Sequence, residues 1–522
     1  HRNEPLIYFI LLLCIAFTFS FSRYALRMWE IILISLFILN GGFLSKIKRL
    51  KHNYPLLVLA SFFFLFVIGT IYTNYPQDGL KYLRIVLPWL GLPIVIGAYP
   101  KLSSRQFFLF LQVFVTGVFI HTIISMLAYL GLPFGEVETF RDLGLYHSIH
   151  RFVLMIVLAI IFLVYLLKTH RTQLKPWQIA VYLIIGVWLT GFLFFTKSLT
   201  GILVFIFIAL SYFFYLVLVQ RNRYLRFVSL GILALFLGLI GTKVYELYSY
   251  FWNIPEPSEL NLPEKTVNGN FYSHNTDKID VENGHYVYLY VCEKELKQEW
   301  KERSDFNYHG KSRIYRKIDN LLKRYLASKG LTKDSVGVSK LTHSDIEAIE
   351  NGIFNYKFKS FDFVDRIYRI TNEFYEYQNY NKPIGTFTSR LYALEIGIKL
   401  FKKRPIIGYG SKSLRPVYND YYSDKKLEGR YYIVSHNQFL SYMIEFGLVG
   451  LVWFLVSIFY PFFYLRAYKL FLFNGLVAYY ILAAQMTTPF SSQLALTIWI
   501  TFFSIFFVYF NPSKTREVHT NP

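Results

Sequence analysis

Long apolar runs recur along most of the chain, and they constrain its fold more than any other feature. A helix needs about 20 mostly apolar residues to cross the hydrocarbon core of a bilayer. The runs therefore predict an all-α polytopic membrane protein with about twelve transmembrane helices. They cover roughly residues 5–22, 29–45, 54–74, 84–99, 107–131, 151–167, 177–196, 200–219, 227–247, 437–463, 474–490 and 492–510.

The first run, 5–22, has an alternative interpretation as a signal peptide. Ser20-Phe21-Ser22 resembles a small-x-small cleavage site at its end. Cleavage there would leave an odd number of spans, so the transmembrane interpretation fits the remaining pattern better.

The net charge of +22 does not indicate nucleic-acid binding. Most of the excess Lys and Arg lies in short loops, where such charge orients a chain in the membrane. No groove-reading or basic-aromatic module is present, so the expected partner is the lipid bilayer. Cys14 lies in an apolar run and Cys292 in a polar segment, so no disulfide is expected between them. The spacing of Cys and His residues does not match a metal-binding motif.

Loop charge predicts the orientation of the chain. The loops 46–53, 168–176 and 220–226 are rich in Lys and Arg, as are the segments after 463 and 510, whereas the short loops between them are poorer. All the basic loops lie on one side if both termini are cytoplasmic. The predicted organisation is helices 1–9 in residues 1–247, an extracytoplasmic loop subdomain in 248–436, and helices 10–12 in 437–522.

The large loop has helical signals of its own. Residues 312–329 place apolar side chains on one face and end at Gly330. Thr342 and Asp345 form a capping-box pattern for a second short helix that ends near Gly352. The loop is therefore expected to fold as a small, mainly helical subdomain.

The segment 390–450 carries the residues best suited to chemistry. His436 comes just before the tenth apolar run, where an imidazole at the membrane surface can accept a proton near neutral pH. Gly447 lies eleven residues later, which on a continuous helix places both residues on one face. Gly450 lies near the same stripe, where small residues let another helix approach closely.

Basic residues precede this histidine on the side where the positive-inside rule predicts none. Arg390 and Arg404 suit bidentate phosphate recognition, and Lys403 adds charge. The turn from Pro405 to Gly410 would let backbone approach a ligand. Each feature also has a structural alternative: an interfacial histidine without catalytic role, an arginine that anchors lipid headgroups, and glycines that serve a tight turn or helix packing.

This segment resembles the C-terminal signature of the O-antigen ligase/polymerase superfamily. His436-Asn437, nine residues, Gly447, two residues and Gly450 match the ligase pattern. Arg390 and the stretch from Arg404 through Pro405 to Gly410 are similar to the family's arginine and PxxGxG lead-in.

The resemblance implies a membrane glycosyltransferase that is inverting, independent of metals and without cofactors. It implies that His436 activates the acceptor hydroxyl and that Arg390, then Arg404, binds the pyrophosphate of a polyprenyl-linked glycan donor. Lys403 and Asn437 are further candidate substrate contacts. Where members carry a Ser-Arg pair early in a mid-chain helix, this chain has Ser198-Leu199, and Lys197 is the candidate substitute.

The acceptor stays open at this level. The signature favours a glycolipid, lipid A–core, and hence an O-antigen ligase at the bacterial inner membrane with a periplasmic site. The alternatives are an O-antigen polymerase and a protein O-oligosaccharyltransferase. A polysaccharide transporter or flippase would show charge deep within spans and broken helices, whereas these apolar runs are nearly free of charge.

Overall fold

The computed structural model describes residues 3–512, except residues 138, 171–173, 220–221, 253, 279, 314, 360–362, 381–385 and 426–432. Parts of the basic loops 168–176 and 220–226, and most of the segment after 510, lie outside this description. The contacts divide the chain into two units. Unit 1 comprises residues 1–216 and 393–522, and unit 2 comprises residues 217–392. The predicted boundaries at 248 and 436 stay predictions.

Unit 1 is helical throughout its described part, and several of its helices begin with proline at the first position. Proline lacks the N–H that a first helical turn leaves unpaired, so Pro55, Pro76, Pro88 and Pro176 suit helix starts. The elements are α1 (Glu4–Thr18), α2 (Arg23–Leu39), α3 (Phe43–His52), α4 (Pro55–Tyr72), α5 (Pro76–Val86), α6 (Pro88–Ala98), α7 (Ser104–Tyr129), η1 (Asp142–Gly144), α8 (Ile149–His170), α9 (Pro176–Phe195), α10 (Leu199–Val219), α17 (Thr386–Lys403), α18 (Leu414–Asp424), α19 (Gln438–Tyr464), η5 (Ala467–Lys469), α20 (Phe471–Met486), η6 (Pro489–Ser491) and α21 (Gln493–Phe510). The helices α10 and α17 cross the unit boundaries.

The helices confirm the all-α membrane class. By length and composition, the described residues hold seven segments able to cross a bilayer: Pro55–Tyr72, Pro76–Ala98, Ser104–Tyr129, Ile149–Thr169, Pro176–Phe195, Gln438–Tyr464 and Gln493–Phe510. The pair α2 and α3, bent by 114°, raises this number to eight if it is one span. The helix α1, the segment Leu199–Phe214 and the helix α20 are shorter apolar helices. The number of about twelve spans stays a prediction.

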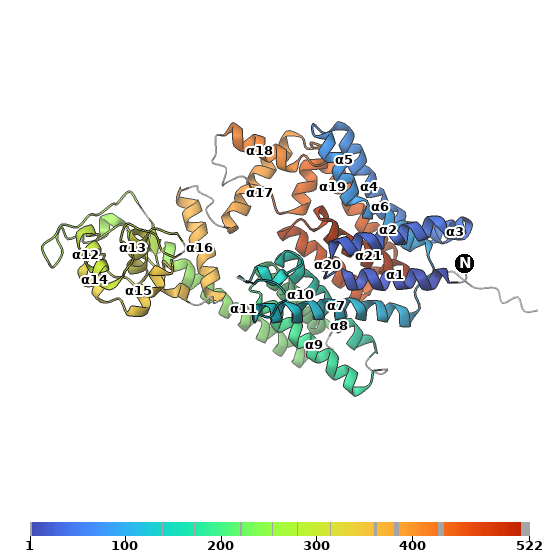
Figure 1. Ribbon diagram of the computed structural model, residues 1–522, viewed down its shortest axis with the longest axis horizontal. Helices are drawn as coiled ribbons and strands as arrows, with labels where there is room; N and C mark the ends of the chain where they lie inside the picture. Colours follow the sequence, from blue (N-terminus) through green and yellow to red (C-terminus); the bar gives the residue numbers. More distant parts are fainter. Residues whose placement is uncertain are drawn as a thin grey trace, which may run out of the picture. The chain divides into compact units, whose positions relative to one another are not determined.

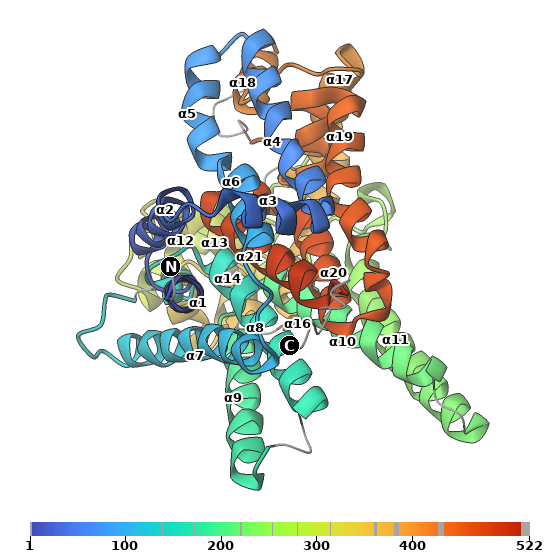
Figure 2. The same cartoon turned by 90° about the vertical axis from the view of Figure 1, so that its right-hand side faces the viewer.

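Helix α4 lies at the centre of one half of unit 1. It packs against α19 and α6, and α6 packs in turn against α21 (Figure 2). Buried aromatic rings fill this contact: the ring of Phe62 lies 4.9 Å from that of Trp89 and 5.3 Å from those of Tyr442 and Phe454. Rings at this separation contribute both buried apolar area and edge-to-face attraction. The high aromatic content of the chain is thus used to fix α4 against α19.

Unit 2 contains the small helical subdomain that the loop sequence predicts, shown by α12 to α15 in Figure 1. Its helix α13 begins at Ile318, later than the predicted 312, and ends before Gly330. The capping box between Thr342 and Asp345 is confirmed at the start of α15. The elements of unit 2 are α11 (Arg223–Trp252), η2 (Pro257–Glu259), β1 (Val281–Glu282), β2 (His285–Tyr286), α12 (Glu293–Arg303), α13 (Ile318–Ser328), α14 (Ser335–Ser339), α15 (His343–Glu350), η3 (Tyr356–Lys359) and α16 (Phe363–Tyr380).

A buried carboxylate joins the elements of unit 2. Glu282 on β1 is fully buried and accepts a hydrogen bond of 2.7 Å from Nε of Arg324 on α13. Its other oxygen accepts from Nδ2 of Asn355 at 2.7 Å, and Tyr368 on α16 lies 3.5 Å away. A buried charge is tolerated only when it is paired and hydrogen-bonded, so these contacts hold α13 and α16 to the short sheet.

We expect Arg324→Met to destabilise unit 2 by about 3–5 kcal/mol, because it removes the guanidinium that pairs with the buried carboxylate of Glu282. Limited proteolysis of the purified full chain over a temperature series would measure this loss. The matched control is Arg313→Met, since Arg313 is exposed and 3.8 Å from Glu350, a surface pair contributing about 0–1 kcal/mol. Equal losses in both variants would contradict the prediction.

Candidate active site

His436 lies at the start of α19, between residues that are tied down on both sides. Ser435 and Gln438 are fully buried, whereas the side chain of His436 is exposed. The backbone N–H of Asn437 donates to Oγ of Ser435 at 3.1 Å. The exposed imidazole therefore lies between two buried residues, Ser435 and Gln438.

The side chain of Asn437 fixes this position to two helices. Its Oδ1 accepts from the N–H of Leu440 at 3.0 Å, which caps α19. Its Nδ2 donates to Oε1 of Gln485 on α20 at 2.9 Å. Through these bonds Asn437 holds the start of α19 against α20. The predicted contact of Asn437 with substrate stays a proposal.

Gln438 makes the second attachment. Its Oε1 accepts from the N–H of Phe490 at 3.1 Å, and its Nε2 lies 3.4 Å from Oγ of Ser491. Both partners belong to η6, the turn between α20 and α21. The amide of a buried glutamine is thus satisfied by the turn it packs against, as buried polar groups require.

The chain reverses direction at Gly447, which has φ +65° and ψ −162°. From Tyr442 to Phe446 it passes along α4 from Phe62 toward Gly69. From Gly450 onward it returns, with Trp453 donating to Ser61 at 2.9 Å and the hydroxyls of Tyr460 and Tyr54 3.0 Å apart.

The structure therefore differs from the continuous helix on which the sequence analysis placed His436 and Gly447 on one face. The nine residues 438–446 form a separate helical arm (hereafter the arm), about 13 Å long at 1.5 Å per residue. His436 precedes the arm and Gly447 ends it.

The stretch Pro405–Gly410 supplies the hydrogen bonds that this reversal leaves open. The carbonyls of Pro405 and Ile406 accept from the N–H groups of Leu448 and Val449 at 2.8 and 3.2 Å. The N–H groups of Tyr409 and Gly410 donate to the carbonyls of Ile444 and Glu445 at 3.0 and 2.7 Å. A broken helix leaves such groups unpaired, and burial without partners is costly. The PxxGxG stretch thus approaches the backbone of α19, where the sequence analysis had expected a ligand.

Two glycines permit the close approach of this stretch to α19 and to α4. A Cβ on Gly447 would lie 2.1 Å from the carbonyl oxygen of Ile406, and one on Gly410 would lie 2.6 Å from that of Gly69. The backbone angles of Gly447 belong to a region that is essentially restricted to glycine. Gly450 lies close to both the arm and α4, because its added Cβ would lie 2.1 Å from Cβ of Phe446 and 3.2 Å from Cδ2 of Leu65.

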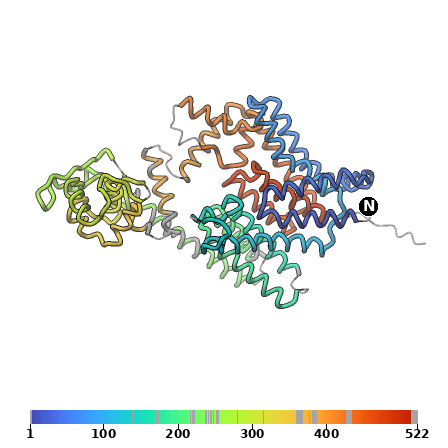
Figure 3. The backbone as a smooth tube through the Cα atoms, viewed as in Figure 1, coloured from blue at the N-terminus to red at the C-terminus, as the bar shows by residue number. Residues whose placement is uncertain are grey.

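The same stretch is anchored to α4. The N–H of Ser411 donates to the carbonyl of Gly69 at 3.0 Å, and its hydroxyl donates to that of Phe66 at 2.7 Å. The hydroxyl of Tyr72 donates to the carbonyl of Ile407 at 2.6 Å. The course of the chain from α17 through this stretch into α18 can be followed in Figure 3. α4, the lead-in stretch and α19 therefore form one interlocked junction.

Buried acidic residues modify the expectation that the apolar runs are nearly free of charge. Glu445 is buried at the end of the arm, beside the backbone of Lys412 and Leu414. Glu30 is buried on α2. Such residues within membrane segments are costly and therefore warrant a functional explanation.

The other predicted site residues are placed by the structure as follows. Arg404 is exposed, and its guanidinium lies 4.8 Å from the centre of the Tyr409 ring. Lys403 is exposed in the last turn of α17, where a cation also interacts favourably with the helix dipole. Lys197 occupies the turn between α9 and α10, with its Nζ 4.4 Å from the centre of the Phe140 ring.

Arg390 lies in the second turn of α17 and is half-buried. Burial lowers the pKa of its guanidinium. Arginine remains protonated over the physiological range, so this position provides a permanent charge in a partly dehydrated setting. Arg390 belongs to unit 2, whereas His436 belongs to unit 1.

The loop 132–150 between α7 and α8 forms a polar cavity of about 400 Å³, lined among others by Arg141 and His147. Burial lowers the pKa of His147 to about 4, so this imidazole is neutral at physiological pH. It contacts the carbonyl of Phe19 at 3.1 Å through Nε2.

Sequence reasoning missed Gln438, Gln485 and Ser491 as supports of His436. Gln438 was the one signal available, since a polar side chain next to the predicted site precedes an apolar run. Its partners come from α20 and η6, about 50 residues later, and nothing in their local sequence marks them.

The fold and this junction define an integral membrane protein whose candidate site is carried by a reversed helix. Residues 349–455 match the family model described as O-antigen ligase. The matched segment includes Arg390, the lead-in stretch and the whole arm. The resemblance to the O-antigen ligase superfamily is thereby confirmed. No curated protein shows a significant match to the chain.

We expect Gly447→Ala to lower the stability of unit 1, since the backbone angles alone cost an alanine about 1–3 kcal/mol and the Ile406 carbonyl would have to move. The measurement is the thermal midpoint of the purified chain in detergent. The control Gly191→Ala lies in α9, where an added Cβ meets nothing within 4 Å. The prediction fails if the two midpoints agree.

Proposed function

We propose that this chain is a membrane glycosyltransferase that moves a glycan from a polyprenyl-pyrophosphate carrier to an acceptor hydroxyl. The observation that carries the proposal is the exposed His436, held at the end of the arm within the segment that matches the O-antigen ligase model. Within this class we propose the ligase reaction, with lipid A–core as acceptor, at the periplasmic face of the bacterial inner membrane.

The chemical step is a single displacement. The acceptor hydroxyl loses its proton to His436 as its oxygen attacks the anomeric carbon of the donor sugar. The bond between that carbon and the pyrophosphate oxygen breaks, so the configuration inverts and the polyprenyl pyrophosphate leaves. His436 then releases its proton to water. A positioned base contributes about 10²–10⁴-fold to such a step.

Negative charge develops on the leaving pyrophosphate, and this chain offers arginine to stabilise it. Arg390 combines partial burial with a planar, bidentate fork. Arg404, Lys403 and Lys197 are exposed or half-exposed cations that can steer the donor. The charge stabilisation is assigned to these side chains, and the proposal needs no cofactor.

We expect His436→Ala to abolish the long-chain glycolipid ladder in cells that lack the native protein. Loss of the base slows transfer by about 10²–10⁴-fold, so polymer should accumulate on the polyprenyl carrier. The measurement is a gel of surface glycolipids beside an analysis of carrier-linked glycan. His309→Ala, at an exposed histidine of unit 2, is the control and should keep the ladder.

The same gel separates the alternatives. A core that carries a single repeat unit would identify a polymerase, and loss of glycan from proteins with an unchanged ladder would identify a protein O-oligosaccharyltransferase. Retained transfer in His436→Ala would contradict the catalytic role. If no glycan changes in the absence of the whole protein, the transporter hypothesis replaces this proposal; the buried Glu30 and Glu445 and the broken α19 are the features it would use.

We expect Arg390→Gln to reduce transfer by about 10²-fold in an assay with purified protein and carrier-linked glycan, as does removal of one donor to developing charge in other enzymes. Arg390→Lys should fall between, because lysine keeps the charge and loses the bidentate fork. Arg105→Gln, at an exposed arginine of α7, should transfer normally. Wild-type rates in Arg390→Gln would remove this residue from the proposed site.

A further inference from the structure

A cavity of about 380 Å³ opens beside the turn that holds Gln438. It lies between α2, α5, α6 and the start of α21, and its walls are mainly aliphatic, formed by Ile31, Ile34, Ile85 and Leu92 among others. A space of this size accommodates a small headgroup with the first part of an apolar chain. An aliphatic wall of this kind suits a hydrocarbon tail.

Three cations line the same cavity: Arg27 on α2, and Lys81 and Arg84 on α5. All three are exposed. Lys81 and Arg84 lie in a segment counted as able to span the membrane, where a cation is costly without a counter-ion. Lys81 is 3.7 Å from Asp78, but the described residues offer Arg84 neither an ion pair nor a hydrogen bond. Among the described residues, the charge of Arg84 is therefore uncompensated at an apolar wall of the cavity.

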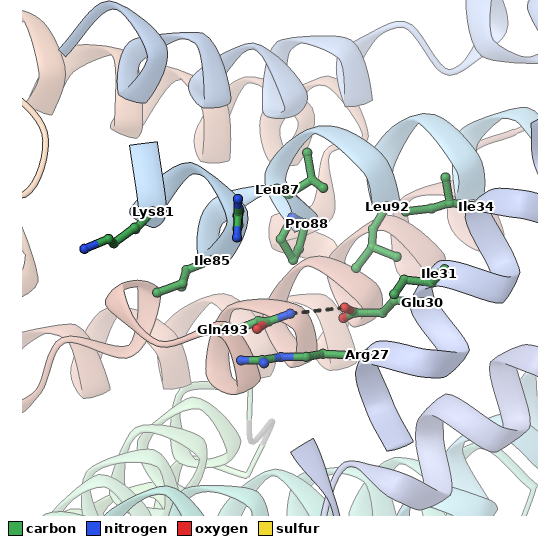
Figure 4. A pocket seen from close by; sticks show the side chains of 11 residues that line it. Arg27, Glu30, Ile31, Ile34, Lys81, Ile85, Leu87, Pro88, Leu92 and Gln493 are labelled. Atoms are coloured by element: carbon green, nitrogen blue, oxygen red, sulfur yellow. Dashed lines mark hydrogen bonds between the residues drawn. The ribbon is translucent and has the colours of Figure 1, made fainter. Parts of the chain in front are cut away.

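Two polar side chains, Gln493 and Glu30, also line this cavity. Nε2 of Gln493 on α21 lies 3.5 Å from Oε2 of Glu30, and Figure 4 shows these side chains pointing toward one another. Glu30 also lies close enough to Arg27 for charge interaction. Glu30 is thus an acidic neighbour of Arg27, and Asp78 is one of Lys81, whereas Arg84 has no acidic partner among the described residues.

The cavity is connected to the candidate active site through a few residues. Gln438, two residues after His436, contacts Ser491 of η6. Gln493, two residues after Ser491, contacts Glu30 in the cavity. The turn between α20 and α21 thus lies between the start of the arm and the cavity.

We propose that this cavity binds the phosphate of a lipid, with the phosphate at Arg27, Lys81 and Arg84 and the start of the lipid chain along Ile31, Ile34, Ile85 and Leu92. Guanidinium groups pair with phosphate through two parallel hydrogen bonds, and the aliphatic wall removes chain methylenes from water. Two lipids carry this chemistry: a polyprenyl phosphate and an anionic phospholipid. The polyprenyl source rests on the function proposed above.

Lipid binding to the purified full chain in detergent, measured by native mass spectrometry, tests the site. The probes are undecaprenyl monophosphate, phosphatidylglycerol and, as a zwitterionic reference, phosphatidylcholine. We expect Arg27→Gln/Arg84→Gln to weaken binding of at least one anionic probe by about tenfold or more. The matched control Arg49→Gln/Arg105→Gln removes two exposed arginines of α3 and α7 and should bind as the wild type does.

Each outcome of this experiment decides a point. Weaker binding of undecaprenyl monophosphate alone identifies the polyprenyl source, and weaker binding of phosphatidylglycerol alone identifies the bilayer lipid. Weaker binding of both supports a site for the shared phosphate. Partial recovery in Arg27→Gln/Arg84→Lys supports a charge effect and answers the objection that the variant misfolds. Unchanged binding of both anionic probes, or equal loss of phosphatidylcholine, overturns the proposal.

The readout is independent of glycan transfer. His436→Ala should bind both anionic probes like the wild type, because His436 does not line the cavity. If His436→Ala keeps transferring glycan while the arginine variant loses lipid, the proposed function fails and the lipid site stands. The reverse pattern removes the lipid site and leaves the proposed function in place.

Discussion

The four backbone hydrogen bonds between Pro405–Gly410 and the reversal in α19 are the contacts on which the candidate site depends. They pair the groups that a helix leaves open when it breaks inside an apolar bundle, and without them the reversal at Gly447 would bury unsatisfied carbonyls and N–H groups. Anchoring of Ser411 to α4 then fixes the junction to the rest of unit 1. This junction therefore fixes the end of the arm at Gly447.

The far end of the arm is held by different contacts. Asn437 and Gln438 attach it to α20 and η6 through side-chain amides, so His436 is positioned by a junction at one end of the arm and by the C-terminal helices at the other. Support from both ends suits a general base, whose efficiency depends on a fixed reach to the proton it accepts. The cavity with its cations and aliphatic wall lies next to this support, because the turn η6 contacts Gln438 and is followed by Gln493, which lines the cavity.

Sequence alone predicted the helical membrane class, the small helical subdomain and the importance of 390–450, because apolar run length, capping patterns and a spaced motif are local signals. It misread the geometry of that motif. A glycine in an apolar run indicates close packing as readily as a break, and only the partner stretch at 405–410 distinguishes the two. The supports of His436 on α20 and η6, and the cavity beside Arg84, join residues distant in sequence, so no local pattern could predict them.

The arm also gives a meaning to the fixed interval between Asn437 and Gly447. Both ends of the arm are held in place, so the number of its residues sets the rotation of His436 about the helix axis as well as its distance from Gly447. One residue inserted or removed would turn His436 by about 100° around the arm and shift it by about 1.5 Å, away from the face that the amides select. The residue types of the arm can therefore vary as long as the number of its residues stays the same. In a flexible loop, an inserted or deleted residue would have little effect on the position of His436.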